Sequence, residues 1–433
     1  MASHSLYRLV LFGGLGGYEI AAALTSILGM DSTPASVLVR AVVASSALGV
    51  ILLDVDQVFS RRKRLILGFC LFWYLYSLRV AYALTFSAER LGFPGWYYWS
   101  WSLGACALPM VALSLWRPSL ADAERNFMTL FIALGIGGAL ASFGATSMEV
   151  TVNNDVIETG RLQLTALNPI LLGQLGATLL VLSLWALISQ FGGRAVWVRV
   201  MFISAAAVGG GLLIGANSRG PLVSAAMCLL FMAIASSQRS RLYTLLVLFV
   251  AAAGFAPVAK QLEESYGFST YTRLFGQSQL TEENTLDRLS RFDGAFHAFM
   301  SNPLLGSSLE EPTHGGYPHN ILVEALMTTG FLGGLLLLLL VLSVFVKAVR
   351  IYAMRPAYGW VSLLFVQHVF AVQFSGSINT VNYFWLAAGL VISVHSTIPS
   401  RKKRALPAAP PTPIPTSPDV LSCSNPPARP LGL

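Results

Sequence analysis

Twelve long runs of apolar residues constrain the fold of this chain more than any other feature. A helix needs about 20 largely apolar residues to cross the hydrocarbon core of a bilayer, and each run is about that long. The runs are centred near residues 18, 44, 76, 106, 136, 178, 206, 228, 249, 334, 366 and 388. The pattern predicts an all-α fold, a polytopic membrane bundle of about 12 transmembrane helices.

The small supply of charged residues excludes the main classes of soluble protein. Only 11% of the 433 residues are charged and 55% are hydrophobic, whereas a soluble domain carries about 25% charged residues. This composition excludes an ordinary soluble enzyme and a disordered chain. Three of the four cysteines lie inside apolar runs, so neither a disulfide framework nor a CxxC metal site is predicted.

Basic residues alternate between the connecting segments, and this alternation predicts the orientation. With twelve spans, 19 of the 28 lysines and arginines fall on one side, including the clusters at 61–64 and 401–404. The short segments of the other side hold only Arg40, Arg90 and Arg161. Because Lys and Arg accumulate on the cytoplasmic side, both termini are predicted to be cytoplasmic. The net charge of +8 then reflects topology and does not indicate nucleic-acid binding.

The spans divide the chain into four segments. Residues 1–258 hold spans 1–9, and residues 259–318 form a large polar loop on the non-cytoplasmic side that contains an amphipathic helix. Residues 319–397 hold spans 10–12. Residues 398–433 are rich in proline and cannot bury a core, so they are predicted to be a disordered cytoplasmic tail.

Arg219 stands at the start of the eighth span, on the outer side. Ser218 before it is a candidate N-cap, and Pro221 suits the first turn of a helix. An arginine beside helix N-terminal amides makes an anion site, whereas the alternative is an arginine that only marks the membrane border. Cations are disfavoured at the positive end of a helix. An anionic partner would remove that conflict, which favours the anion site.

The loop contains a second pair of arginines on a predicted amphipathic helix. In TLDRLSRFDGAFHAFM, apolar residues recur at helical spacing. Arg288 and Arg291 are three residues apart and share part of one face. The alternative interpretation is a solvated charged face on which Asp287 pairs with Arg291 at i,i+4.

Two histidines close the loop before the tenth span. His319 follows Pro318 where the chain re-enters the bilayer, and it can take a proton near neutral pH or simply anchor the chain at the interface. His314 is a weaker candidate, and Glu310 and Glu311 are interpreted as solvated loop residues. No nucleotide-binding, HExxH or GxSxG motif occurs, and no spacing singles out metal ligands. Neither a metal nor a cofactor is predicted.

Three short motifs in this region resemble those of the O-antigen ligase/polymerase family. RLSRFDGAFHAFMSNPLLGSS resembles the signature R-x-x-x-aromatic…A…NPLLG. His319 and Asn320, followed after nine residues by Gly330-Phe-Leu-Gly333, resemble H-[NSQ]-x9-G-x-x-G, and SRGP resembles an arginine-bearing helix start. The resemblance covers about residues 210–345.

This resemblance implies a C-type integral-membrane glycosyltransferase fold with its site facing the periplasm of a bacterial inner membrane. Such enzymes move a glycan from a polyprenyl (undecaprenyl) diphosphate donor to a sugar hydroxyl, with inversion and without metal. It assigns Arg219 and Arg288, with Arg291 beside them, to the donor diphosphate. It makes His319 the general base, with Asn320 and His314 supporting. The expected partners are the lipid-linked donor, a lipid A core or glycan acceptor and membrane lipids, and no nucleic acid.

Other functions stay open at this point. An O-antigen or exopolysaccharide polymerase of the same family would use the same residues with another acceptor. A 12-span secondary transporter would depend instead on ionisable groups within the spans, chiefly Arg79 and His368. The late position of the loop and the lack of matched halves weigh against a transporter. A non-catalytic scaffold gives no reason for three motifs to converge.

Overall fold

Helices make up most of the chain that the structure describes. The computed structural model describes residues 2–54, 64–86, 91–152, 155–164, 167–190, 195–266, 271–272 and 279–398. One compact unit spans Met1–Thr397, and residues 398–433 form a second unit. Apart from residue 398, the predicted disordered tail lies outside the described residues.

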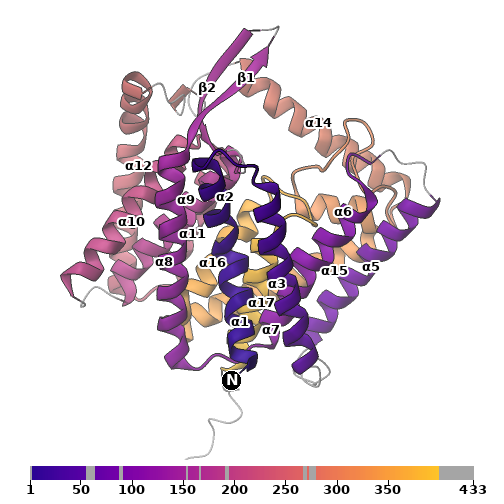
Figure 1. The fold of residues 1–433 in the computed structure, drawn as a ribbon, viewed down its shortest axis with the longest axis horizontal. Coiled ribbons are helices and arrows are strands. Elements are labelled where there is room, and N and C mark those ends of the chain that lie inside the picture. The colour runs from indigo at the N-terminus through magenta and orange to yellow at the C-terminus, as the bar shows by residue number, and fades with distance from the viewer. Residues whose placement is uncertain are drawn as a thin grey trace, which may run out of the picture. The chain divides into compact units, whose positions relative to one another are not determined.

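The helices follow the predicted spans in chain order (Figure 1). The first part comprises α1 (Ala2–Phe12), the π-helical η1 (Gly13–Gly17), α2 (Tyr18–Ile27), α3 (Thr33–Leu53), α5 (Arg64–Phe86), α6 (Gly95–Trp99), the π-helical η3 (Ser100–Ala107), α7 (Leu108–Leu115) and α8 (Leu120–Gly144). The second part comprises α9 (Pro169–Trp185), the π-helical η4 (Ala186–Gln190), α10 (Val196–Gly215), α11 (Arg219–Ala235), α12 (Gln238–Tyr266), α14 (Gln279–Ser301), α15 (Ile321–Met354), the short 3-10 helix η5 (Pro356–Tyr358), α16 (Gly359–Ala371) and α17 (Asn382–Ser396).

The lengths of these helices confirm a polytopic membrane bundle. Within the described residues, eight helical stretches are long and apolar enough to cross a membrane, and they coincide with predicted spans 1–7 and 10. The other four predicted spans fall on α11, α16, α17 and the apolar part of α12, which are shorter. The all-α membrane fold is therefore confirmed, whereas the count of twelve spans stays a prediction.

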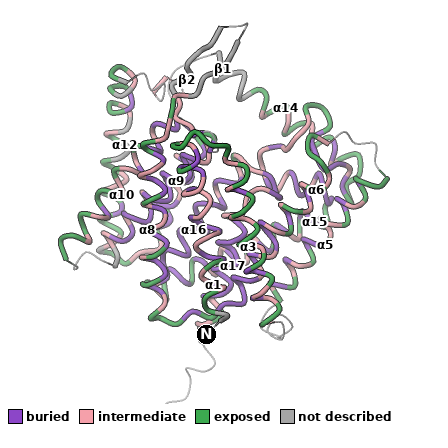
Figure 2. The backbone as a smooth tube through the Cα atoms, in the orientation of Figure 1, coloured by how far each residue is buried: buried purple, intermediate pink, exposed green. Residues whose placement is uncertain are grey.

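Burial separates central helices from helices that face an apolar solvent. The helices α16 and α17 are buried along nearly their whole length (Figure 2). Peripheral helices expose large apolar side chains, among them Leu38 of α3, Trp197 of α10 and Phe249 of α12. A helix that is apolar on its exposed side as well as its packed side needs lipid around it. The pattern is that expected of a protein embedded in a bilayer.

A β-hairpin that the sequence analysis did not predict joins α8 to α9. The strand β1 (Thr146–Val152) pairs antiparallel with β2 (Asp155–Gln163), from Thr146 opposite Gln163 to Val152 opposite Asp155. The strands are rich in Thr, Val and Ile, which favour extended structure. Figure 1 shows the hairpin at the same end of this unit as α14.

A kink at Gly330 joins two of the predicted motifs. Gly330 lies inside α15 with φ 64° and ψ −165°, a conformation essentially restricted to glycine. The break allows the amide of Phe331 to donate to the carbonyl oxygen of Pro303 at 2.7 Å. The amide of Ser307 donates to the carbonyl oxygen of Met327 at 3.0 Å. The NPLLG segment therefore packs directly into the kinked helix that carries G-x-x-G.

Candidate functional site

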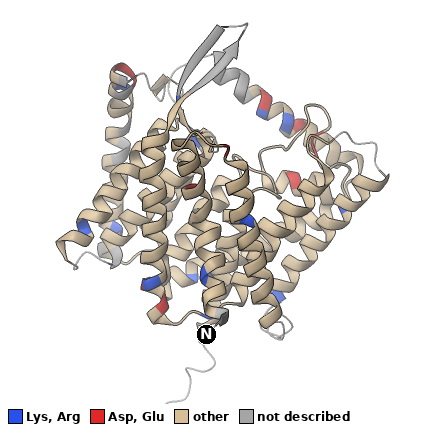
Figure 3. Ribbon diagram, in the orientation of Figure 1, with Lys and Arg blue, Asp and Glu red and all other residues tan. Residues whose placement is uncertain are grey.

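The predicted site residues come from three segments that meet at one end of the bundle. Arg219 begins α11, Arg288 and Arg291 lie on α14, and His319 and Asn320 precede α15. Charged residues are sparse along the helices, and α14 carries several of them (Figure 3). In its described part, the structure brings Arg288 and Arg291 close to His319, and Arg219 close to Arg288.

Asn320 fixes the entry into α15. Its side-chain oxygen accepts hydrogen bonds from the amides of Leu322 at 3.0 Å and Val323 at 3.1 Å, so it is the N-cap of the helix. Its side-chain nitrogen donates to the carbonyl oxygen of Gln373 at 3.3 Å, in the segment between α16 and α17. Asn320 thus has a positioning role, because it holds its neighbour His319 against that segment.

His319 is held in an unusual backbone conformation in a partly buried position. Its φ is +61°, in the left-handed region that non-glycine residues rarely adopt. Its ring lies 4.6 Å from that of Tyr317, and its buried Nδ1 has no hydrogen-bond partner among the described residues. Burial, followed by the charges of Arg288 and Arg291, lowers the pKa of His319 to about 4. The imidazole is therefore neutral at physiological pH and able to accept a proton.

Arg288 contacts the segment after α16 and lies within electrostatic range of Arg219. Its Nη1 donates to the carbonyl oxygen of Phe374 at 3.2 Å. Burial lowers the pKa of the Arg288 guanidinium, and Arg219 adds to this effect while Tyr317 opposes it. Arg219 and Arg288 are thus close enough to repel each other electrostatically. An anion between them would relieve that repulsion.

At the start of α11, one part of the prediction fails. Ser218 occupies the N-cap position, but its side chain does not accept a hydrogen bond from the first turn. Pro221 lies in that turn as predicted. The first amides of α11 therefore lack the side-chain cap that a serine usually provides. The helix begins at Arg219, whose side chain is exposed.

Arg291 is more constrained than Arg288. Its Nε lies 3.0 Å from the carboxylate of Asp287, so the predicted i,i+4 pair is confirmed. Its Nη1 donates to the carbonyl oxygen of Gly315. Arg291 therefore ties the loop before α15 to α14, and its charge also acts on His319.

Glu311 contradicts the interpretation of this loop as solvated. Its side chain is fully buried and accepts hydrogen bonds from the amides of Thr313 at 2.8 Å and His314 at 2.7 Å. Burial alone would raise the pKa of Glu311, but the bonds from Thr313 and His314 outweigh it and hold that pKa below its usual range. The interpretation was wrong because these partners become available only when the loop folds back on itself.

His314 belongs to the same hydrogen-bonded loop. Its Nδ1 lies 3.0 Å from Glu311, and its Nε2 lies 3.1 Å from the hydroxyl of Ser290 on α14. Both ring nitrogens thus have partners inside the loop and on α14, which distinguishes His314 from His319.

Glu310 connects this loop to a distant segment, so it is not a solvated residue either. Its carboxylate accepts hydrogen bonds from the amides of Gly92 at 3.0 Å and Gly316 at 3.1 Å, and from the hydroxyl of Tyr98. These bonds join the loop before α15 to the start of α6. Glu310 positions the backbone three residues before His319.

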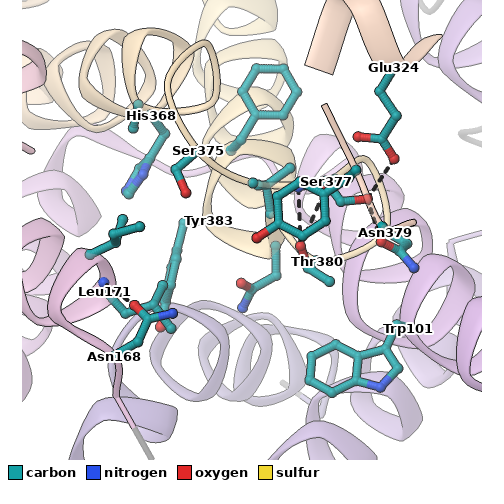
Figure 4. A pocket seen from close by; sticks show the side chains of 18 of the residues that line it. Trp101, Asn168, Leu171, Glu324, His368, Ser375, Ser377, Asn379, Thr380 and Tyr383 are labelled. Atoms are coloured by element: carbon teal, nitrogen blue, oxygen red, sulfur yellow. Dashed lines mark hydrogen bonds between the residues drawn. The ribbon is translucent and has the colours of Figure 1, made fainter. Parts of the chain in front are cut away.

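A cavity of about 340 Å³ lies next to this site (Figure 4). Tyr317, whose ring contacts His319, forms part of its wall, whereas His319 and the three predicted arginines are not among the lining residues. The lining combines aromatic rings with amides, hydroxyls and one guanidinium, represented by Tyr97, Trp101, Asn168, Thr380, Tyr383 and Arg40. These side chains come from segments spread between α2 and α17, so no local sequence motif could have indicated the cavity.

Besides Glu310, the charged groups Arg40 and Glu324 of the cavity wall have well-defined contacts. The guanidinium of Arg40 lies 3.6 Å from the centre of the Trp101 ring and 4.6 Å from that of Tyr18. Glu324 is buried and accepts hydrogen bonds from the hydroxyl of Ser377 at 2.5 Å and the amide of Ile378 at 3.0 Å. Protein donors therefore already occupy Glu324, and the Arg40 guanidinium lies over one face of Trp101.

The two ionisable residues that a transporter would need have structural partners. Arg79 of α5 is buried and donates to the carbonyl oxygen of Ser307, which follows the NPLLG segment. His368 of α16 is buried and stacks on Tyr383 with ring centres 5.4 Å apart. Among the described residues, no group of three His, Cys, Asp or Glu could hold a metal ion.

The fold and the site together define a multi-pass membrane protein with a basic, histidine-containing site at one end of its bundle. Residues 204–338 match the family model described as O-antigen ligase. The match spans Arg219, α14 and the start of α15, and it confirms the predicted resemblance to the O-antigen ligase/polymerase family. It supports a membrane enzyme of the O-antigen ligase/polymerase type. No curated protein matches the chain at a significant level.

Proposed function

We propose that this protein transfers a glycan from a polyprenyl diphosphate donor to a sugar hydroxyl at the periplasmic face of a bacterial inner membrane. The transfer is inverting, O-antigen ligase-like and independent of metal. One observation carries the proposal: the charges of Arg288 and Arg291 act on a neutral His319, and the charge of Arg219 acts on Arg288.

The arginines have the chemistry that the leaving group requires. When the bond between the anomeric carbon and the diphosphate oxygen breaks, its electron pair leaves with the diphosphate, which gains negative charge. Preorganised donors that stabilise such charge are often the largest contribution to catalysis. A guanidinium can bind a phosphate through two parallel hydrogen bonds. Arg288 is partly desolvated, which strengthens this interaction further.

His319 has the protonation state that the acceptor requires. The acceptor oxygen attacks the anomeric carbon on the face opposite the diphosphate, and its proton passes to the imidazole. A low pKa keeps His319 neutral before the reaction. Binding of the anionic donor offsets the charges of Arg288 and Arg291, so the basicity of His319 rises when the donor is present.

The adjoining cavity supports a sugar substrate. Sugar rings present C–H groups on their faces and hydroxyls at their rims, and the cavity offers aromatic rings together with amides and hydroxyls. Its volume lies near the lower end of the range of about 300–1,000 Å³ for small-molecule sites. It is therefore large enough for part of a glycan next to the reacting bond, while the rest of the glycan lies outside.

The test compares glycan transfer by properly inserted His319→Ala and Arg219→Ala variants with the wild type. A general base contributes about 10²- to 10⁴-fold, so His319→Ala is expected to lose at least that order of activity. His297→Ala is the matched control, because the exposed side chain of His297 on α14 lies 3.6 Å from that of Asp293 and is not among the predicted site residues. Wild-type rates in both site variants would show the assignment to be wrong.

A polymerase of the same family is the second candidate, since the same residues would serve a different acceptor. Gene deletion followed by analysis of surface glycans separates the two. Loss of long-chain lipopolysaccharide with accumulation of donor indicates a ligase, and single-repeat caps indicate a polymerase. A secondary transporter would instead lose function on replacement of Arg79 and His368 and retain it on replacement of Arg288 and His319.

A further inference from the structure

The helix α14 has one side packed on the protein. Ala295 and Ala298 are buried against Met327 and Val323 of α15. A Cβ on Gly294 would lie 2.0 Å from the carboxylate of Glu311, so the helix is pressed against the loop. Arg288 and Arg291 also contact protein from this helix. One side of α14 is therefore fixed against the loop and α15.

The exposed side of α14 carries an apolar stripe that no described residue covers, with the Asp293–His297 pair at one edge of it. Five large apolar side chains there are between 44% and 64% exposed: Leu286, Leu289, Phe292, Phe296 and Met300. They recur at helical spacing and form one stripe. Covering such side chains is favourable by about 25 cal/mol for each Å² of apolar surface removed from water. A continuous stripe of this kind marks a contact surface.

The length of α15 places the end of α14 at the border of the hydrocarbon. The part of α15 after the kink, from Phe331 to Met354, holds 24 residues and measures about 36 Å, somewhat more than the hydrocarbon thickness of about 30 Å. Lys347 and Arg350 mark one border of the hydrocarbon, because lysine and arginine side chains extend to the headgroups. Gly330 lies 17 residues before Lys347, about 25 Å along the helix axis. The opposite border therefore lies close to Gly330.

The apolar stripe continues onto the membrane-facing surface at this level. A Cβ on Gly330 would lie 2.3 Å from the carbonyl carbon of Leu304, so the segment after α14 meets α15 at that border. Leu304 and Leu305 are more than 60% exposed, and Phe331 and Leu332 beside them on α15 are more than 50% exposed. The exposed apolar surface thus runs from α15 along the whole described face of α14.

We propose that the apolar face of α14 docks on the lipid of the adjacent leaflet as an interfacial helix. Amphipathic helices of this kind bury their apolar face about 5–10 Å into the boundary between headgroups and acyl chains. The helix then carries Arg288 and Arg291 at the depth of lipid phosphates, so a lipid-linked diphosphate reaches them by lateral diffusion within the leaflet. This consequence rests on the proposed function, whereas the docking itself does not.

The test measures the depth of spin labels on the full-length protein in vesicles of phosphatidylcholine and phosphatidylglycerol. Labels are attached at Leu289→Cys and Phe296→Cys in a Cys423→Ser background, with His297→Cys as the matched control on the same helix. Of the remaining cysteines, Cys106 and Cys228 are buried and Cys70 is half-buried. The unsubstituted background reports any labelling of those three. Collisions with oxygen report lipid contact, and collisions with a soluble nickel chelate report water contact.

Labels at 289 and 296 are expected to collide severalfold more with oxygen and severalfold less with nickel than the label at 297. Equal nickel collisions at the three positions would overturn the proposal. Low collisions with both reagents, together with spin–spin broadening, would mean that a second copy covers the stripe, which overturns it as well. If the labels are deep but Arg288 variants transfer normally, the docking stands and the proposed function fails.

Discussion

Replacing Gly330 with alanine tests how the site is held in place. Gly330 is the residue at which the NPLLG segment enters the kink of α15. A Cβ there would lie 2.3 Å from both the carbonyl carbon and the carbonyl oxygen of Leu304. Both are backbone atoms, so no side chain can rotate to make room.

The cost of Gly330→Ala has two parts. Holding a non-glycine residue at φ 64° and ψ −165° costs about 1–3 kcal/mol. Forcing an extra methyl group into a packed contact costs about 1–3 kcal/mol more. The expected destabilisation of about 2–6 kcal/mol is a large fraction of a typical unfolding free energy of about 5–15 kcal/mol.

The assay is the apparent thermal midpoint of detergent-solubilised protein, followed by size-exclusion chromatography after heating, together with the rate of glycan transfer. Gly211→Ala is the matched control, because nothing lies within 4 Å of a Cβ at that position of α10. Alanine is favoured over glycine in a helix by about 1 kcal/mol, so the control should keep or raise the midpoint. A midpoint and a transfer rate for Gly330→Ala equal to those of the control would refute the packing argument.

Three further predictions concern the loop, the base and the cavity. Glu311→Gln should lower the thermal midpoint, because hydrogen bonds to a charged group are worth about 1.5–3 kcal/mol each and the carboxylate accepts two at 2.8 and 2.7 Å; an unchanged midpoint would contradict this. The activity of the wild type, measured as kcat/KM, should fall as the pH is lowered through about 4, because the pKa of His319 is lowered to about 4. In Arg288→Gln this fall should move to higher pH, since loss of a positive charge raises the pKa of His319. A fall at pH 6.5 in the wild type would contradict the assignment. Trp101→Ala should raise the KM for a glycan substrate about 2- to 10-fold, because it removes an aromatic contact worth about 0.5–1.5 kcal/mol. The measurement is the initial rate as a function of glycan concentration. Trp197→Ala is the control, because Trp197 lies on the exposed surface of α10.

Features that depend on neighbouring residues could be predicted from the sequence. The apolar spacing in α14 and the four-residue separation of Asp287 and Arg291 are local, and both the helix and the pair are present. The motifs around His319 and Gly330 identified the region that the family model matches. What these local patterns could not indicate is the kink that brings Leu304 against Gly330.

Features that depend on distant residues could not be predicted. Glu310 resembles any loop acid until Gly92 and Tyr98, more than 200 residues earlier in the chain, supply its hydrogen bonds. The cavity is built from side chains between Tyr18 and Phe384, and each of them alone is an ordinary membrane-helix or loop residue. Only the packing of the helices gives these residues a common surface.

Separate measurements of donor binding and transfer test the central claim most directly. Binding of a polyprenyl diphosphate to the purified protein in nanodiscs is compared with glycan transfer for Arg288→Gln and His319→Ala. Arg288→Gln should raise the Kd for the donor about 10- to 150-fold, because it removes charge-assisted hydrogen bonds to the diphosphate. His319→Ala should bind the donor as the wild type does and transfer about 10²- to 10⁴-fold more slowly. Wild-type binding by Arg288→Gln together with wild-type transfer by His319→Ala would contradict the account.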